Sequence, residues 1–144
     1  MSRETIATAL FALLNTPTMQ ATFKEISRRP KLWEQAAVKP CLFLAQPEDD
    51  TVHKNGTATP GETTMDFDVI VYIDTGLDPN TVPDTLVNNC IDLIEAAIAP
   101  PNPLQAQTLG GLVNRAWIDG QITRVPGYVD GRGIIFMTIR VLVP

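Results

Sequence analysis

The order of polar and apolar residues predicts most of the secondary structure of this chain. Residues 63–74 alternate between two faces, and the segment 135–143 repeats the same alternation. Because successive side chains of a strand point to opposite faces, each segment is predicted to be a strand with one face in the core. The predicted core positions are Met65, Phe67, Val69, Val71, Ile73, Ile135, Met137, Ile139, Val141 and Val143.

Apolar residues recur at helical spacing in two other segments. The first predicted helix begins after Ser2, whose hydroxyl can cap it, and ends at Thr16-Pro17. The second is predicted to begin at Pro83 and to end before Pro100. Their apolar stripes are Ile6, Leu10, Leu13 and Leu14, and Leu86, Val87, Cys90, Ile91, Ile94 and Ile98.

Three further segments have less regular patterns. The continuous apolar run 41–45 favours a strand covered on both faces and ended by Pro47. Residues 22–27 favour only a weak strand. Residues 47–62 contain hardly an apolar residue, which predicts a long polar loop of the kind that is usually functional or mobile.

A hairpin with its turn at 126–131 completes the order helix, weak strand, strand, long strand, helix, strand, strand. This order is typical of one α+β domain, here residues 1–144, with a mostly antiparallel (mixed) β-sheet packed against two main α-helices.

Composition narrows the classes of function. A net charge of −5 argues against a protein that binds bare nucleic acid, since phosphate neutralisation needs a basic surface. One histidine and two separated cysteines cannot form a Cys/His zinc cluster within one chain. No segment approaches the roughly 18 apolar residues that indicate a membrane span. Cys41 and Cys90 lie among apolar residues and are expected to be buried thiols, which fits assembly in the cytoplasm.

Candidate chemistry is sparse. Asp74-Thr75-Gly76 is found in aspartic proteases, but that chemistry needs two carboxylates that share a proton, and a strand ending in a glycine turn explains the match. Asp66 and Asp68 share a strand face at about 7 Å, where a pair can hold a cation or transfer protons. A solvated face or a subunit interface explains that pair more simply. We therefore predict no enzyme activity, no metal and no cofactor.

Charged and aromatic residues indicate two regions for contacts with other chains. In the polar loop, the candidates for partner or channel contacts are Glu48, Asp49, Asp50, His53 and Lys54. Elsewhere, the candidates for a subunit or partner interface are Arg28, Arg29, Trp33, Asp66 and Asp68.

Some stretches form a pattern beyond secondary structure. They are Ser27-Arg28-Arg29 with Trp33, 40–43, 71–79, 91–97, 107–113 and 116–120. In this order and spacing they resemble a family of small phage structural proteins encoded in tail-gene clusters. The element order is also similar to that of the lambda-like tail terminator proteins. The resemblance covers nearly the whole chain and rests on scaffold residues rather than on a catalytic motif.

The resemblance implies a homo-oligomeric ring, usually of six subunits, in the tail–neck region of a virion. Such a ring contacts the tail tube protein, stops its polymerisation and presents a surface to the head connector or neck protein, while DNA passes through without specific binding. No membrane is involved. The edges of the 63–74 strand and of the final hairpin are expected to make the ring contacts. A neck or head–tail connector protein is the alternative, and a small acidic enzyme or ligand-binding domain is a third.

Overall fold

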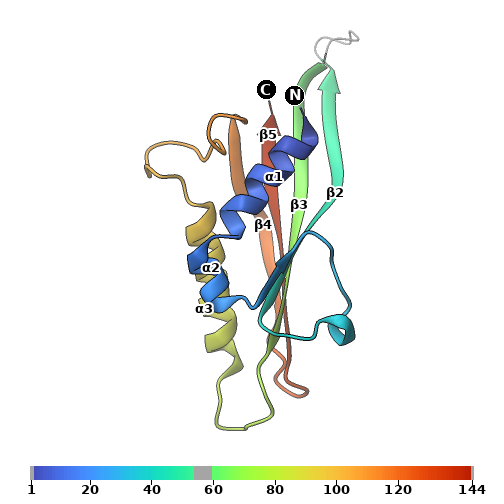
Figure 1. Ribbon diagram of the computed structural model, residues 1–144, viewed down its shortest axis with the longest axis vertical. Helices are drawn as coiled ribbons and strands as arrows, with labels where there is room; N and C mark the ends of the chain where they lie inside the picture. Colours follow the sequence, from blue (N-terminus) through green and yellow to red (C-terminus); the bar gives the residue numbers. More distant parts are fainter. Residues whose placement is uncertain (1, 54–59, 144) are drawn as a thin grey trace.

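One sheet and the helices on one of its faces make up the domain (Figure 1). The computed structural model describes residues 2–53 and 60–143. Its helices are α1 (Arg3–Leu14), α2 (Pro17–Thr22) and α3 (Pro83–Ile98), with a 3-10 helix η1 (Trp33–Gln35). Its strands are β1 (Glu25–Ser27), β2 (Cys41–His53), β3 (Pro60–Asp74), β4 (Arg115–Val125) and β5 (Arg132–Val143).

The strand order is β1-β2-β3-β5-β4, in which β1 is parallel to β2 and the other neighbours are antiparallel. The predicted α+β class with a mostly antiparallel sheet is therefore confirmed. The expectation that the 63–74 strand offers an edge is wrong, because β3 lies between β2 and β5. Of the final hairpin, only β4 is an edge strand.

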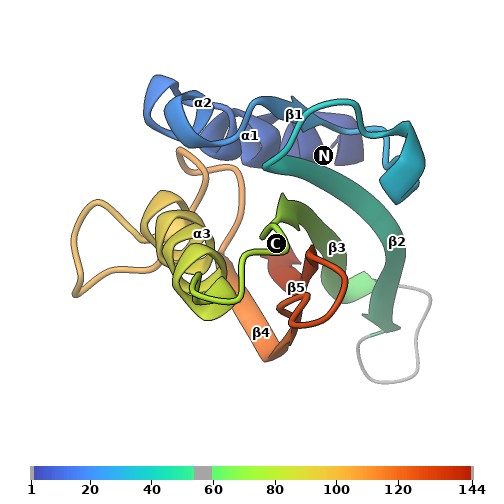
Figure 2. The same cartoon turned by 90° about the horizontal axis from the view of Figure 1, so that it is seen from below.

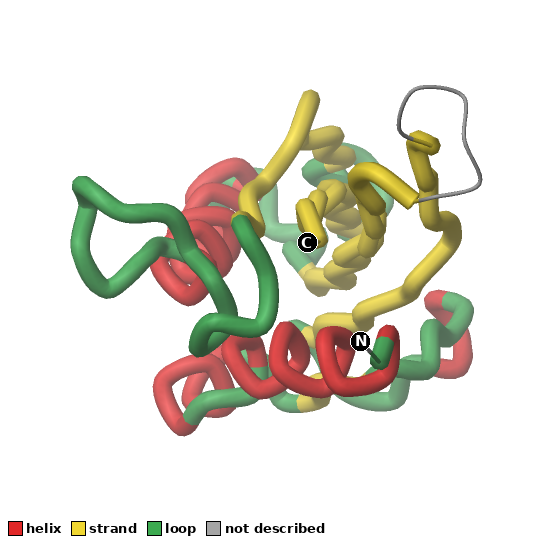
Figure 3. The backbone as a smooth tube through the Cα atoms, turned by 90° about the horizontal axis from the view of Figure 1, so that it is seen from above, coloured by secondary structure: helices red, strands yellow, loops and turns green. Residues whose placement is uncertain are grey.

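The core lies between the sheet and the three helices, which views along the strands place on the same side (Figures 2 and 3). All ten core positions predicted in the two alternating strands are buried. The stripe of α3 is buried too, except for Leu86, which was predicted to be in the core and is exposed. Cys41 and Phe43 pack on the other face of β2 with Ala36, so the expectation of a strand covered on both faces is confirmed.

Local sequence signals set the helix boundaries at the start of the chain. The Ser2 hydroxyl accepts a hydrogen bond from the Thr5 amide at 3.3 Å, as predicted. Thr16-Pro17 does more than end α1, because the Thr16 hydroxyl accepts from the Met19 amide and Pro17 opens α2. The weak strand predicted at 22–27 is shorter in the structure and is limited to β1.

The predicted polar loop 47–62 is wrong for most of its length. Strand β2 continues to His53 and pairs with β3, which begins at Pro60. Pro47 does not end β2, because it lies in a β-bulge between Ala45 and Glu48, where no ladder hydrogen bond requires its missing N–H. Strand pairing needs backbone hydrogen bonds and not hydrophobic side chains, so two polar segments form a hairpin here. We call residues 46–53 and 60–64 the arm, which extends past the start of α1 (Figure 1).

No helix in the described part of the chain is both long and apolar enough to cross a membrane.

Candidate functional site

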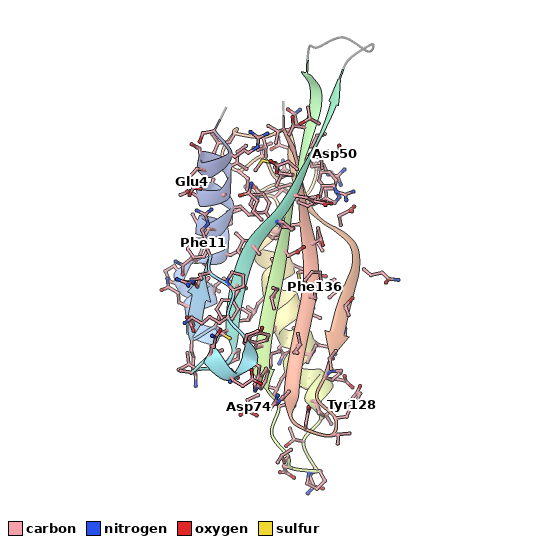
Figure 4. All side chains as sticks on the ribbon, turned by 90° about the vertical axis from the view of Figure 1, so that its right-hand side faces the viewer. Glu4, Phe11, Asp50, Asp74, Tyr128 and Phe136 are labelled. Atoms are coloured by element: carbon pink, nitrogen blue, oxygen red, sulfur yellow. The ribbon has the colours of Figure 1, made fainter. Side chains whose placement is uncertain are left out.

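The sheet face opposite the helices is uncovered over most of its length and faces the viewer in Figure 4. Register places four residues in one row across it: Glu48 on β2, Asp66 on β3, Arg140 on β5 and Trp117 on β4. We call this surface the open face.

Arg140 holds together the acidic half of the open face. Its Nε donates to Asp66 at 3.0 Å, and its Nη1 lies 3.0 Å from a carboxylate oxygen of Asp119. In the next row the Thr138 hydroxyl donates to Asp68 at 3.4 Å. The sequence prediction that Asp66 and Asp68 share a face is confirmed. Sequence analysis did not find Arg140 and Asp119. Alternation with apolar neighbours indicates that both lie on the polar side of a strand, but it does not show which residues on other strands they contact.

The environment of Asp68 disfavours its charged form. Burial raises the pKa of the Asp68 carboxyl above its usual range. The hydrogen bond from Thr138 lowers this pKa, and the charge of Asp66 raises it further. The pair is therefore crowded rather than arranged as a matched acid and base.

The open face has an acidic excess. Because opposed residues of an antiparallel pair point to the same face, Glu48 lies with Asp66, and Asp50 lies with Thr64. Among the described side chains, register places six carboxyl groups and three arginines on this face, namely Glu48, Asp50, Asp66, Asp68, Asp74, Asp119, Arg115, Arg132 and Arg140.

The other half of the open face has an apolar centre, with Asp74 and Arg132 at its far end. Phe136 lies midway along it and is 40% exposed (Figure 4), and Ile70 is its neighbour on β3. Trp33 of η1 covers the end of this half, with its ring 5.5 Å from that of Tyr72. The predicted interface residue Trp33 therefore lies on the same face as Asp66 and Asp68.

The other predicted contact residues lie elsewhere. Asp49 points to the helix side and pairs with Arg3 of α1. Arg28 pairs with Glu4 of the same helix, and the Arg29 amide donates to the Ser27 hydroxyl at 3.0 Å. Strand β2 ends at His53, and Lys54 lies outside the described residues.

The remaining residues considered for chemistry are Asp74, Cys41 and Cys90. The Asp74 carboxylate accepts from the Gly76 amide at 3.0 Å and so closes a turn. Both cysteines are free, and burial raises the pKa of each thiol to about 11. In residues 2–53 and 60–143 no group of three or more His, Cys, Asp or Glu side chains is placed to hold a metal ion.

A groove of about 460 Å³ opens between the end of α3, the 99–107 loop and β4. Gln107 forms its wall and donates to the carbonyls of Ile98 and Ala99. Glu95 and Arg115 contribute opposite charges to its lining. The lining residues described here include no nucleophile with an adjacent base.

Comparison with known proteins gives no family for this chain: neither a protein-family model nor a curated protein matches its sequence.

Proposed function

We propose that this protein is a phage tail terminator, a subunit of a closed ring that ends the tail tube and presents a joining surface to the head connector or neck. One observation carries the proposal. Helices cover one face of the sheet, its other face is open, and among the described residues the edges of β2 beyond Phe43 and of β4 outside its bridge to Gln107 have no strand neighbour. A sheet of this kind is suited to continue into further copies of itself.

The two edge strands run in the directions that such a ring requires. Strand β1 pairs with β2 only as far as Phe43, so the edge of β2 from Leu44 onward has no neighbour in the described chain. Strand β4 forms the opposite edge and runs antiparallel to β2, as the alternating directions of β2, β3, β5 and β4 require.

Rotation about an axis along the strands therefore brings β4 of one copy beside β2 of the next in antiparallel pairing. Because these edges are different surfaces, the contact is heterologous and closes into a ring when the rotation divides a full turn. The bulge at Pro47 makes the β2 edge irregular and restricts it to a matching partner.

In this ring the helices lie outside and the open face lines the channel. The excess of carboxylates over arginines on that face repels DNA phosphates at short range, so DNA passes without being held. The arm projects at one end of the ring, where it can reach an axial neighbour.

Deletion of the gene from the phage that encodes it tests the proposal. A terminator's loss gives over-long, headless tails in electron micrographs, and a plasmid copy restores normal length. Tails of normal length that fail to join heads would instead identify a neck protein, and unchanged particles would exclude both roles.

The channel charge has its own test. Glu48→Gln combined with Asp50→Asn removes two charges from the open face, and Asp92→Asn with Glu95→Gln removes two from the helix side as a matched control. We expect only the first variant to form rings that retain duplex DNA at low salt, measured by fluorescence anisotropy. Equal DNA binding by both variants would show that the channel charge has no role.

A further inference from the structure

Two surfaces on opposite edges of the domain are complementary in charge and in apolar character. The basic edge is the segment 24–39, which consists of β1, η1 and the residues around them. The apolar end is formed by the loop before α3, the first turns of α3 and the β4–β5 turn, and its members are Leu77, Val82, Leu86, Val125, Tyr128 and Val129. We propose that the apolar end of one copy binds the basic edge of its neighbour, a contact that rests on the proposed ring and specifies its subunit interface.

The apolar end is unusually exposed for large hydrophobic side chains. Val129 is 91% exposed and Leu77 is 75% exposed. Exposed apolar groups gathered in one place mark protein contact sites more often than isolated ones do. Figure 4 shows Tyr128 at this end of the molecule, opposite the arm.

Hydrogen bonds hold the loops of the apolar end in place. The Tyr128 hydroxyl donates to the Asp84 carboxylate on α3 at 2.8 Å. The Thr75 amide donates to the Gly131 carbonyl at 2.9 Å, which joins the loop after β3 to the β4–β5 turn. A preformed surface loses little entropy on binding.

Four acidic residues lie around the apolar end, together with Arg124 and Arg132, so its rim is acidic on balance. Asp74, Asp78 and Asp130 use a carboxylate oxygen to accept a hydrogen bond from a nearby backbone amide, and Asp84 accepts from Tyr128. None of these four carboxylates has an ion pair within the described chain. The apolar end is therefore suited to a partner with an apolar centre and a basic rim.

The basic edge has that composition. It carries five cations against two acids, Lys24, Arg28, Arg29, Lys31 and Lys39 against Glu25 and Glu34. Glu25 pairs with Lys31, and Arg28 pairs with Glu4, whereas Arg29 is exposed and has no ion pair in the described chain. Leu32, which is 65% exposed, and Val38 supply apolar surface between the cations.

Sheet register places the two surfaces at the same height. Glu25 of the basic edge pairs with Cys41, which lies in one row with Tyr72, Ile134 and Val125, and Val125 belongs to the apolar end. Strands β1 and β4, which carry Glu25 and Val125, are the outer strands on opposite edges, while η1 of the basic edge reaches across the open face, where Glu34 pairs with Arg132 of β5 at 3.4 Å. A rotation about an axis along the strands therefore brings the basic edge of one copy against the apolar end of the next.

A photo-crosslinking residue at position 129 tests the contact directly. The labelled protein is mixed with isotope-labelled wild-type chain up to millimolar concentration, so that mass spectrometry separates contacts between copies from contacts within one. We expect crosslinks between copies that fall on residues 24–39. Crosslinks to another part of the neighbour, or none between copies, would overturn the inference.

Substitutions measure the strength of the contact. Leu77→Asp and Val129→Asp place charges at the apolar end, and each is expected to weaken self-association at least tenfold in analytical ultracentrifugation. Leu104→Asp is the matched control, because Leu104 is 93% exposed and lies outside both surfaces. An equal loss in the control would contradict the assignment.

Charge exchange tests the pairing itself. Arg29→Glu and Asp78→Lys should each reduce self-association alone, and circular dichroism checks that both variants fold. Mixing them should restore assembly, since every contact in an alternating ring then joins opposite charges. Absence of restoration would contradict the contact between these surfaces.

The crosslinking result and the deletion phenotype test the subunit contact and the terminator role independently. Crosslinks between residue 129 and the basic edge together with normal tails in the deletion phage would retain the contact and reject the terminator role. Over-long tails without such crosslinks would do the reverse.

Discussion

The carboxylate of Asp66 on β3 accepts a hydrogen bond at 3.0 Å from Nε of Arg140 on β5, 74 residues later in the chain. Arg140 also contacts Asp119, so a single guanidinium compensates carboxylates from the two strands that flank its own. The acidic half of the open face depends on this residue.

We predict that Arg140→Gln lowers the free energy of unfolding by about 1 kcal/mol, a size typical of a partly exposed ion-pair network. Urea denaturation at low salt measures the loss, which should shrink in high salt as the carboxylates are screened. Arg29→Gln removes the same charge from an exposed side chain with no ion pair in the described chain, and should change stability little. A salt-independent loss would show that packing and not charge accounts for the role of Arg140.

Asp68 is expected to destabilise the fold in its charged form. Its pKa is raised in the folded state, mainly by burial. A raised pKa of an acid gives stability that is present at low pH and is lost as the pH rises through the folded value. Asp68→Asn should therefore raise the melting temperature by about 1–2 °C at pH 7 and have no such effect at pH 3. A lower melting temperature at pH 7 would contradict this reasoning.

Alanine substitutions at Gly131 and Gly120 distinguish the cost of backbone strain from the cost of a steric clash. Both have positive φ, but a Cβ at Gly131 would lie 2.7 Å from the Gly76 carbonyl oxygen, whereas one at Gly120 meets nothing within 4 Å. We predict that Gly120→Ala costs about 1 kcal/mol, from backbone conformation alone. Gly131→Ala should cost about 2–4 kcal/mol, because the two loops must also separate. Chemical denaturation of both variants measures the difference, and equal costs would show that the loops yield easily.

The two thiols should be inert in the folded protein. Burial raises the pKa of Cys41 and Cys90 to about 11, so both stay neutral well above pH 8. We expect iodoacetamide to modify neither in native protein at pH 8 and both after unfolding in urea. Because the pKa of each thiol is raised from 9.0 to about 11, the stability contributed by the neutral thiols should be lost as the pH rises between these two values. Rapid modification of either thiol in native protein would show that it is reached through local opening.

Periodicity predicted the elements that have one buried face. The alternation of Met65 to Ile73 and the stripe from Val87 to Ile98 follow from local geometry, because a strand repeats every two residues and a helix every 3.6. The sequence also predicted that the Ser2 hydroxyl caps the first helix. Thr16-Pro17 predicts the end of α1 but not the start of α2, because a Thr-Pro pair can either end a helix or begin one.

The sequence by itself determined the α+β class and the buried strand faces, since each depends on residues close together in the chain. Only the tertiary structure decided that β3 lies inside the sheet, that the polar arm pairs into a hairpin, and that Arg140 lies between Asp66 and Asp119. Those outcomes depend on which strands become neighbours and in which register. Strand neighbours and register arise from contacts among distant segments that no local pattern specifies.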